Sequence, residues 1–159
     1  MAFQTRVLVL ANQTADSEGL TEALRTRAAQ GEVTFRLLVP RGRGAEDQLT
    51  AALRRFADAG LAVDGQVCDP DPIVGVHEAW DPREFDEVIV STLARGSSRW
   101  LEADLPHRIA RLTDAPVEHV VPSEIERALA RKRVARPLHH DSERALGPFA
   151  GPVIPDSGN

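Results

Sequence analysis

The sequence predicts one α/β domain over residues 1–121, with a C-terminal extension over residues 122–159. We expect an open, five-stranded parallel sheet in the order 3-2-1-4-5 with helices on both faces. Short apolar runs of strand length alternate with segments whose apolar residues recur every three or four positions. The run Val7–Ala11 is apolar throughout, as in a strand buried on both sides. Parallel neighbours need crossover connections, which the intervening helical segments supply.

Two helices and a strand follow the first strand. The first helix has apolar residues at helical spacing: Leu20, Ala23, Leu24 and Ala28. Gly31 follows where a helix C-cap is expected, and residues 33–39 form the second strand. The second helix has the clearest amphipathic stripe: Leu49, Ala52, Leu53, Phe56 and Ala57. We expect this helix to end at Gly60.

The second half of the domain continues the alternation. Residues 61–67 alternate apolar and polar side chains, which favours a strand near the sheet edge. Asp71 and Pro72 are typical of an N-cap and a first helical position, and this helix should stop near Asp81. Residues 88–90 and 117–121 form the last two strands. Between them we expect Asp104 to cap a helix with one apolar stripe: Leu105, Ile109 and Leu112.

Composition and charge exclude several classes of protein. The net charge is −5, and the acidic excess lies in residues 1–121, so we expect no nucleic-acid surface. No apolar run reaches the length of a membrane span and the first residues do not resemble a signal peptide, which predicts a cytoplasmic protein. The single cysteine, Cys68, cannot form an intramolecular disulfide, and the five histidines form no spaced metal cluster.

The ligand site is expected outside the carboxyl ends of the strands. In open α/β sheets, ligands bind where the strand order reverses, here between the first and fourth strands. The loops at this edge are residues 12–16, 40–44, 68–71 and 91–104. The last of these carries glycine and serines directly before a helix, where free backbone N–H groups suit an anion.

Twelve residues in and beside these loops are the candidate ligand-binding residues. They are Asn12, Gln13, Thr14, Val39, Asp69, Ser91, Thr92, Gly96, Ser97, Ser98, Arg99 and Asp104. The amide and hydroxyl groups can bond a polar ligand, and Arg99 can neutralise a monophosphate or carboxylate. The alternative is that the same residue types form turns and helix caps. Trp100 either stacks on a ligand or anchors the loop against the sheet.

Four segments resemble the universal stress protein family: VLVLANQT, VCDPDP, VIVSTLARGSSRWLEADLPHRI and APVEHVV. The order of elements resembles that family over residues 5–121. The resemblance implies an ATP-type nucleotide over the switch point and a homodimer. We expect the dimer to form through the strand at residues 117–121, because an unpaired apolar edge is a template for a second chain.

The chain departs from the ATP-binding members of that family at the phosphate loop. Aligned on Gly96, Ser91 and Ala94 replace two glycines, and Ala103-Asp104 replaces glycine followed by a hydroxyl residue. A carboxylate at a helix N-terminus repels a triphosphate by like charge. We therefore expect impaired ATP binding, with AMP-like or other small polar ligands still compatible with the loops.

The sequence favours a binding module over an enzyme. His77, His107 and His119 are scattered over different elements, and no serine–histidine–acid set can be assembled from sequence order. A phosphorelay receiver shares this architecture, with Asp69 as the phosphorylated residue, but Asn12-Gln13 is not an acid pair. Two hypotheses stay open: a stress-response module that binds small molecules, and a structural homodimer that binds no nucleotide.

The extension is predicted to begin with a short helix. Residues 123–126 form a capping box, and a basic segment follows. From Pro137 onward prolines and glycines dominate, which predicts an irregular tail.

Overall fold

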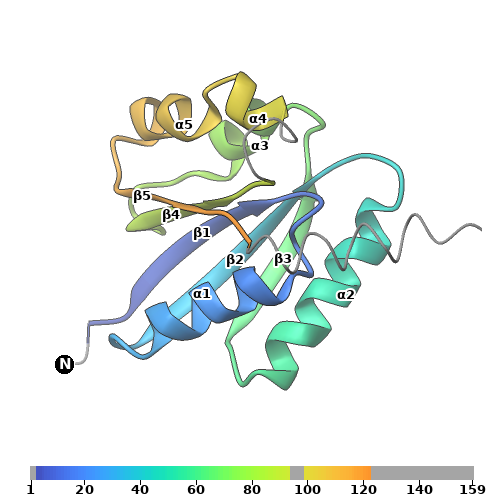
Figure 1. The fold of residues 1–159 in the computed structure, drawn as a ribbon. Helices are drawn as coiled ribbons and strands as arrows, with labels where there is room; N and C mark the ends of the chain where they lie inside the picture. The colour runs from blue at the N-terminus through green and yellow to red at the C-terminus, as the bar shows by residue number, and fades with distance from the viewer. Residues whose placement is uncertain (1–2, 94–98, 123–159) are drawn as a thin grey trace, which may run out of the picture.

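A single five-stranded parallel sheet organises the chain (Figure 1). A computed structural model describes residues 3–93 and 99–122. The strands are β1 (Thr5–Ala11), β2 (Val33–Pro40), β3 (Val63–Cys68), β4 (Glu87–Ser91) and β5 (Val117–Val120). Their order is β3-β2-β1-β4-β5, and every neighbouring pair is parallel. The predicted fold class and strand order are confirmed.

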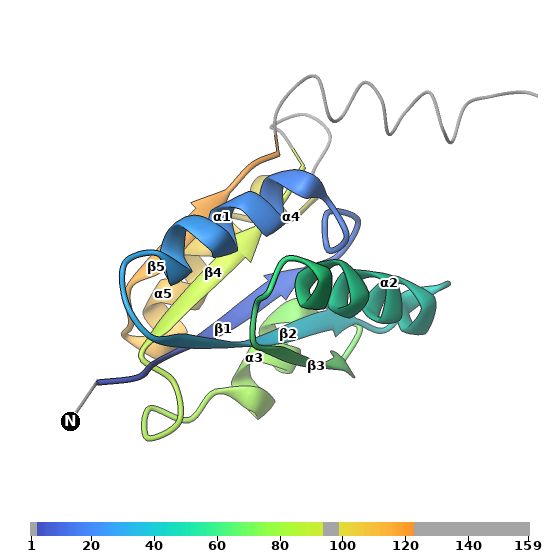
Figure 2. The same cartoon turned by 90° about the horizontal axis from the view of Figure 1, so that it is seen from below.

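Helices cover both faces of this sheet. The longer helices α1 (Glu18–Ala28) and α2 (Ala45–Asp58) lie on one face. On the other face lie α3 (Pro72–Ala79), the short α4 (Arg99–Glu102) and α5 (Leu105–Thr113). The view from below shows α1 and α2 side by side over the strands (Figure 2). This is the three-layer arrangement that right-handed crossovers produce.

The sheet separates two apolar layers because its strands present alternate residues to opposite faces. Val7, Val9 and Phe56 belong to the layer under α1 and α2. Leu8, Leu10 and Ile109 belong to the layer under α3 and α5. Arg27 of α1 makes two hydrogen bonds to the Glu87 carboxylate, of 3.0 and 2.8 Å, and so joins this helix to the start of β4.

The predicted helix boundaries at Asp71 and Gly60 are confirmed. The Asp71 carboxylate accepts a hydrogen bond of 2.9 Å from the Ile73 N–H, and Pro72 occupies the first helical position. Gly60 follows α2 with φ of 76°, a conformation that favours glycine. Gly31 follows α1 in extended backbone instead, and the C-cap residue of that helix is Ala29.

Asp104 occupies the N-cap position of α5, as predicted, but the expected capping hydrogen bond of its side chain is wrong. Asp104 adopts a left-handed conformation with φ of 54°, and its side chain makes no capping bond to α5. Its Oδ1 lies 2.6 Å from the His107 Nδ1 instead. The apolar stripe of α5 also differs from the prediction, because Leu112 is 37% exposed while Thr113 is 7% exposed. The Thr113 hydroxyl is satisfied by donating to the Ile109 carbonyl at 2.8 Å.

Strand β5 lies at an edge of the sheet, as predicted. The Pro116 carbonyl accepts from the Val88 N–H and the Val120 carbonyl accepts from the Thr92 N–H, both at 3.0 Å. Successive residues of a strand direct their backbone groups to opposite sides. The N–H and C=O of His119 therefore face away from β4, toward the open edge.

The predicted capping box and irregular tail lie outside the described residues. Within residues 3–93 and 99–122, the helices are too short and too polar for any of them to cross a membrane. The same residues include no group of three or more histidine, cysteine or acidic side chains placed to hold a metal ion.

Candidate ligand-binding site

A cavity of about 200 Å³ lies at the carboxyl ends of β1 and β4, where the strand order reverses. It is lined by Asn12, Gln13, Thr14, Ser91, Thr92, Leu93, Arg99 and Trp100. The turn after β1 places the first three of these residues. The Asn12 carbonyl accepts from the Ala15 N–H at 3.1 Å, and the Ser17 hydroxyl accepts from the Leu20 N–H to cap α1. The Asn12 backbone carbonyl and the Ser17 hydroxyl make the hydrogen bonds of the turn and the helix cap. The side-chain amides of Asn12 and Gln13 line the cavity.

Three hydroxyl residues of the lining, Thr14, Ser91 and Thr92, make side-chain hydrogen bonds. The Thr14 Oγ1 lies 2.7 Å from the Ser91 Oγ, and both residues are buried. The Thr92 Oγ1 lies 2.7 Å from the His119 Nε2. Desolvation lowers the pKa of His119, which favours its neutral ring. The hydroxyls of Thr14, Ser91 and Thr92 therefore already have partners, and Arg99 is the cationic group of the lining.

A second, larger cavity of about 620 Å³ adjoins the first, because Asn12, Gln13 and Trp100 line both. It extends over the ends of β1 and β2 to the loop of residues 40–44. Pro40, Arg41 and Arg43 line it there, and Pro70 lines it from the loop after β3. The two cavities form one cleft over the carboxyl edge of the sheet.

Trp100 packs in the fold and also lines the cleft. The indole packs against the apolar layer under α3 and α5, and it also lines both cavities. Its anchoring in that layer gives the cleft a fixed aromatic wall, which a planar ligand can contact.

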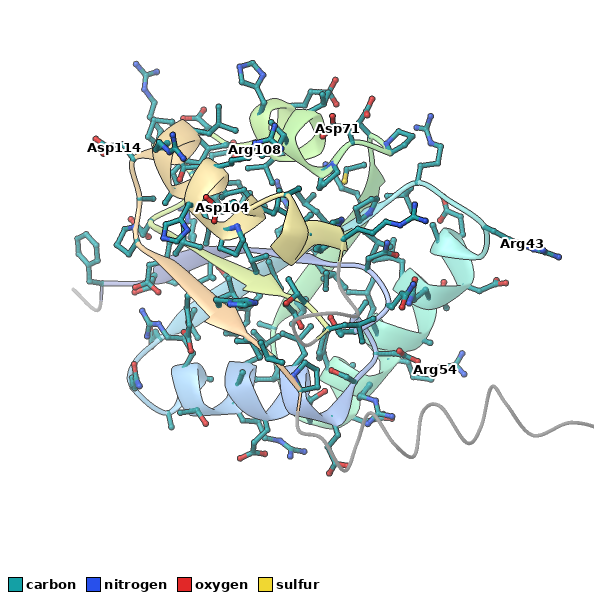
Figure 3. The ribbon with its side chains drawn as sticks, turned by 45° about the horizontal axis from the view of Figure 1, so that its top comes forward. Arg43, Arg54, Asp71, Asp104, Arg108 and Asp114 are labelled. Carbon is teal, nitrogen blue, oxygen red and sulfur yellow. The ribbon has the colours of Figure 1, made fainter. Side chains whose placement is uncertain are left out.

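The remaining candidate residues have different positions. Val39 is fully buried in β2 and does not line either cavity. The Asp69 Oδ1 accepts from the Asp71 N–H at 2.8 Å, which fixes the turn before α3. Asp104 is exposed between α4 and α5 and lines neither cavity (Figure 3). Gly96, Ser97 and Ser98 lie outside the described residues.

Cys68 is a packing residue at the end of β3. Burial raises the pKa of its thiol to about 11, and the neighbouring Asp69 adds to the rise. The thiol is therefore protonated and unreactive at neutral pH.

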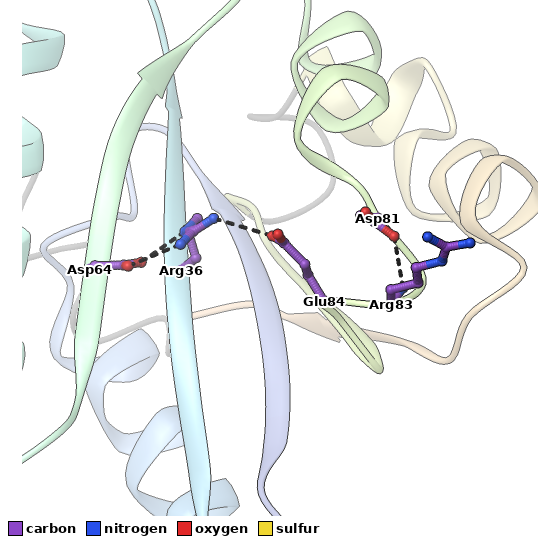
Figure 4. A network of polar contacts seen from close by, with 5 residues as sticks. All are labelled: Arg36, Asp64, Asp81, Arg83 and Glu84. Carbon is purple, nitrogen blue, oxygen red and sulfur yellow. Dashed lines mark hydrogen bonds and ion pairs between the residues drawn. The ribbon is translucent and has the colours of Figure 1, made fainter.

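The arginines of this chain differ in how they are paired. Arg36 of β2 donates to the Asp64 carboxylate at 3.0 and 3.2 Å and lies 3.7 Å from Glu84 (Figure 4). Its guanidinium also lies over the Phe85 ring, 5.5 Å from the centroid. By contrast, Arg41 and Arg43 form no ion pair with any residue that the structure describes.

Comparison with known proteins supports the fold assignment. The chain is similar to the crystal structure of a universal stress protein in complex with cAMP, with a TM-score of 0.57 and 21% sequence identity. The match covers 77% of this chain and 100% of that one. No family model matches the sequence. No curated protein matches it either. At this identity the likeness shows a shared fold.

Sequence reasoning did not predict two features of the cleft. The contact of Thr92 with His119 depends on how β4 and β5 pair, and no local pattern reports it. Arg41 and Arg43, which form no ion pair with any residue in the described part of the chain, lie in a loop predicted at the ligand edge, but they are not among the candidate residues. The available signal was the segment itself, in which Arg41 precedes Gly42 and Arg43 lies between Gly42 and Gly44.

Proposed function

We propose that the protein is a small-molecule-binding module of the universal stress protein type, which takes an AMP-like nucleotide in the cleft. The observation that carries this proposal is the cleft itself, at the switch point, lined by the amides of Asn12 and Gln13, an aromatic wall and arginines. These are the groups that recognise a base, a ribose and a phosphate. The universal stress protein of the same fold, described in complex with cAMP, supports the choice of ligand class.

The proposal includes weak binding of ATP. The Ser91 side chain is buried against Thr14, at a position where a glycine would leave the backbone open to a phosphate. Asp104 adds a negative charge beside the helix that follows the loop, and its effect on a triphosphate is long-range because it lies outside the cavities. Both features disfavour a triphosphate more than a monophosphate.

Binding is tested by native mass spectrometry of the purified protein and by calorimetry with AMP and ATP. We expect a co-purifying nucleotide or micromolar AMP binding, with weaker ATP binding. The double variant Ala103→Gly with Asp104→Ser should recover part of the ATP affinity. Tight, magnesium-dependent ATP binding by the wild type would defeat the argument about the loop.

The proposal also includes a cytoplasmic homodimer that acts by binding and not by catalysis, without nucleic-acid or membrane partners. The outward backbone groups of β5 support pairing with a second copy. A second candidate function, favoured by the already satisfied hydroxyls of the smaller cavity, is a structural homodimer that binds no nucleotide. Absence of binding by both methods, together with a stable dimer, would select it.

A further inference from the structure

The pairing of β4 with β5 brings His119 next to Thr92, the residue that follows the last residue of β4. Val88 and Val90 of β4 belong to the apolar layer under α3 and α5, and Val117 of β5 packs against the same layer. Because side chains alternate between the two faces of a strand, Thr92 and His119 project to this face as well. Val90 pairs with His119, so the imidazole lies where the chain leaves the sheet.

The hydrogen bonds of the Thr92 hydroxyl assign the tautomer of His119. The Thr92 Oγ1 donates to the Leu93 carbonyl at 2.9 Å and lies 2.7 Å from the His119 Nε2. A hydroxyl carries one proton, and a carbonyl oxygen can only accept. The Thr92 proton is therefore used on Leu93, and the His119 Nε2 carries the proton of the other bond. Burial lowers the pKa of His119, so the ring is neutral with its proton on Nε2.

These bonds lie at the start of the loop that follows β4. The Thr92 N–H donates to the Val120 carbonyl at 3.0 Å, so the backbone and the side chain of Thr92 are both attached to β5. Thr92 is only 2% exposed, and Thr92 and Leu93 both line the smaller cavity. The junction between the strand and the loop is therefore held from one side by β5 and faces the cavity on the other.

We propose that His119 is a positioning residue of the ligand site. Its Nε2–H holds the Thr92 hydroxyl, and the hydroxyl in turn holds the Leu93 carbonyl, so the junction keeps one conformation against the ligand. His119 lines neither cavity, and its influence on a ligand passes through Thr92. With its proton on Leu93, the Thr92 hydroxyl has none left to donate to a ligand. The inference rests on the proposed function, because it assigns a further residue to the same site.

The test measures AMP binding by calorimetry on the full chain and its variants. His119→Ala should weaken AMP binding about fivefold, the size of one hydrogen bond. His119→Gln, whose amide N–H can donate to Thr92, should keep the affinity within about twofold. Thr92→Val removes the acceptor and should weaken binding by at least as much as His119→Ala. The double variant Thr92→Val with His119→Ala should lose no more than Thr92→Val alone, because both changes break the same bond.

Two further measurements make the test specific. His77→Ala removes an imidazole from the exposed side of α3, outside both cavities, and should keep the wild-type affinity. Nitrogen-15 NMR of the wild-type imidazoles reads the tautomer without any ligand, and we expect the proton of His119 on Nε2. A neutral His119 ring with its proton on Nδ1 would overturn the inference, as would a loss of affinity in His119→Gln as large as that in His119→Ala.

Urea denaturation of the same variants separates positioning from a structural role. Wild-type AMP affinity in His119→Ala, together with a lower free energy of unfolding, would show that the bond only stabilises the edge of the sheet. That result would overturn this inference but keep the proposed function. No AMP binding by the wild type would overturn both.

Discussion

Gly75 brings α3 close to Cys68 at the end of β3, and its replacement by alanine tests the packing beneath the cleft. A Cβ at this position would lie 2.6 Å from the Cys68 Sγ and 3.0 Å from the Cys68 Cβ. The thiol can rotate away, but the Cβ is fixed to the strand. Gly75→Ala therefore forces a shift of the helix or the strand.

Two opposing terms set the size of the effect. Overpacking of a core costs about 1–3 kcal/mol, while alanine in place of glycine within a helix stabilises by roughly 1 kcal/mol. We expect a net loss of about 1 kcal/mol in the free energy of unfolding. In a Cys68→Ala background the 2.6 Å contact is absent but the 3.0 Å contact with the Cβ of residue 68 remains, so Gly75→Ala should lose less stability there than in the wild type.

Urea denaturation of the four proteins of this cycle measures the coupling between the two sites. Gly42→Ala is the matched control, because a Cβ there meets nothing within 4 Å and Gly42 is exposed. It should change the stability by less than about 0.5 kcal/mol. An identical loss for Gly75→Ala in both backgrounds, or a gain in the wild type, would refute the close approach.

Three other expected outcomes follow from the core and from β5. Phe56→Ala should cost about 3–5 kcal/mol because this ring is fully buried, Leu53→Ala less because it is only partly buried, and the exposed Arg54→Ala little, as compared by urea midpoints. His119→Pro should dissociate the dimer in sedimentation experiments while His119→Ala should not, since only proline removes the outward N–H; a well-folded proline dimer would place the interface elsewhere. The lowered pKa of His119 means that the folded state binds a proton at this ring less readily than the unfolded state does. The free energy of unfolding therefore has its full His119 contribution above about pH 6.5 and loses it as the pH falls. His119→Gln, which can still bond Thr92, should lose less stability between pH 7 and pH 5, and identical pH profiles would contradict this assignment.

Local signals were sufficient to predict most of the fold. The Asp71-Pro72 start of α3 and the glycine after α2 are single-residue requirements of helix ends, and both are observed. Alternation over residues 61–67 predicted an edge strand because one face of β3 is less covered, and β3 lies at the edge. The failure at Asp104 has a local cause too. A histidine three residues later competes for the carboxylate, which then does not cap the helix.

The cleft was less predictable because it depends on register. Ala11 pairs with Ser91, and Val90 pairs with His119, so the ends of three strands coincide at one edge. A slip of one residue in either pairing would turn a hydroxyl to the opposite face. No pattern in the sequence specifies these pairings, although it does specify that the strands exist.

His119 shows why the site and the edge of the sheet must be tested with separate variants. Its ring holds Thr92 at the wall of the smaller cavity, while its backbone groups face the open edge. A proline at this position removes both the imidazole and the outward N–H, so it perturbs the cavity wall and the edge together. An alanine removes only the imidazole. A change in ligand affinity shared by both variants therefore reports the wall, and a change in assembly confined to the proline variant reports the edge.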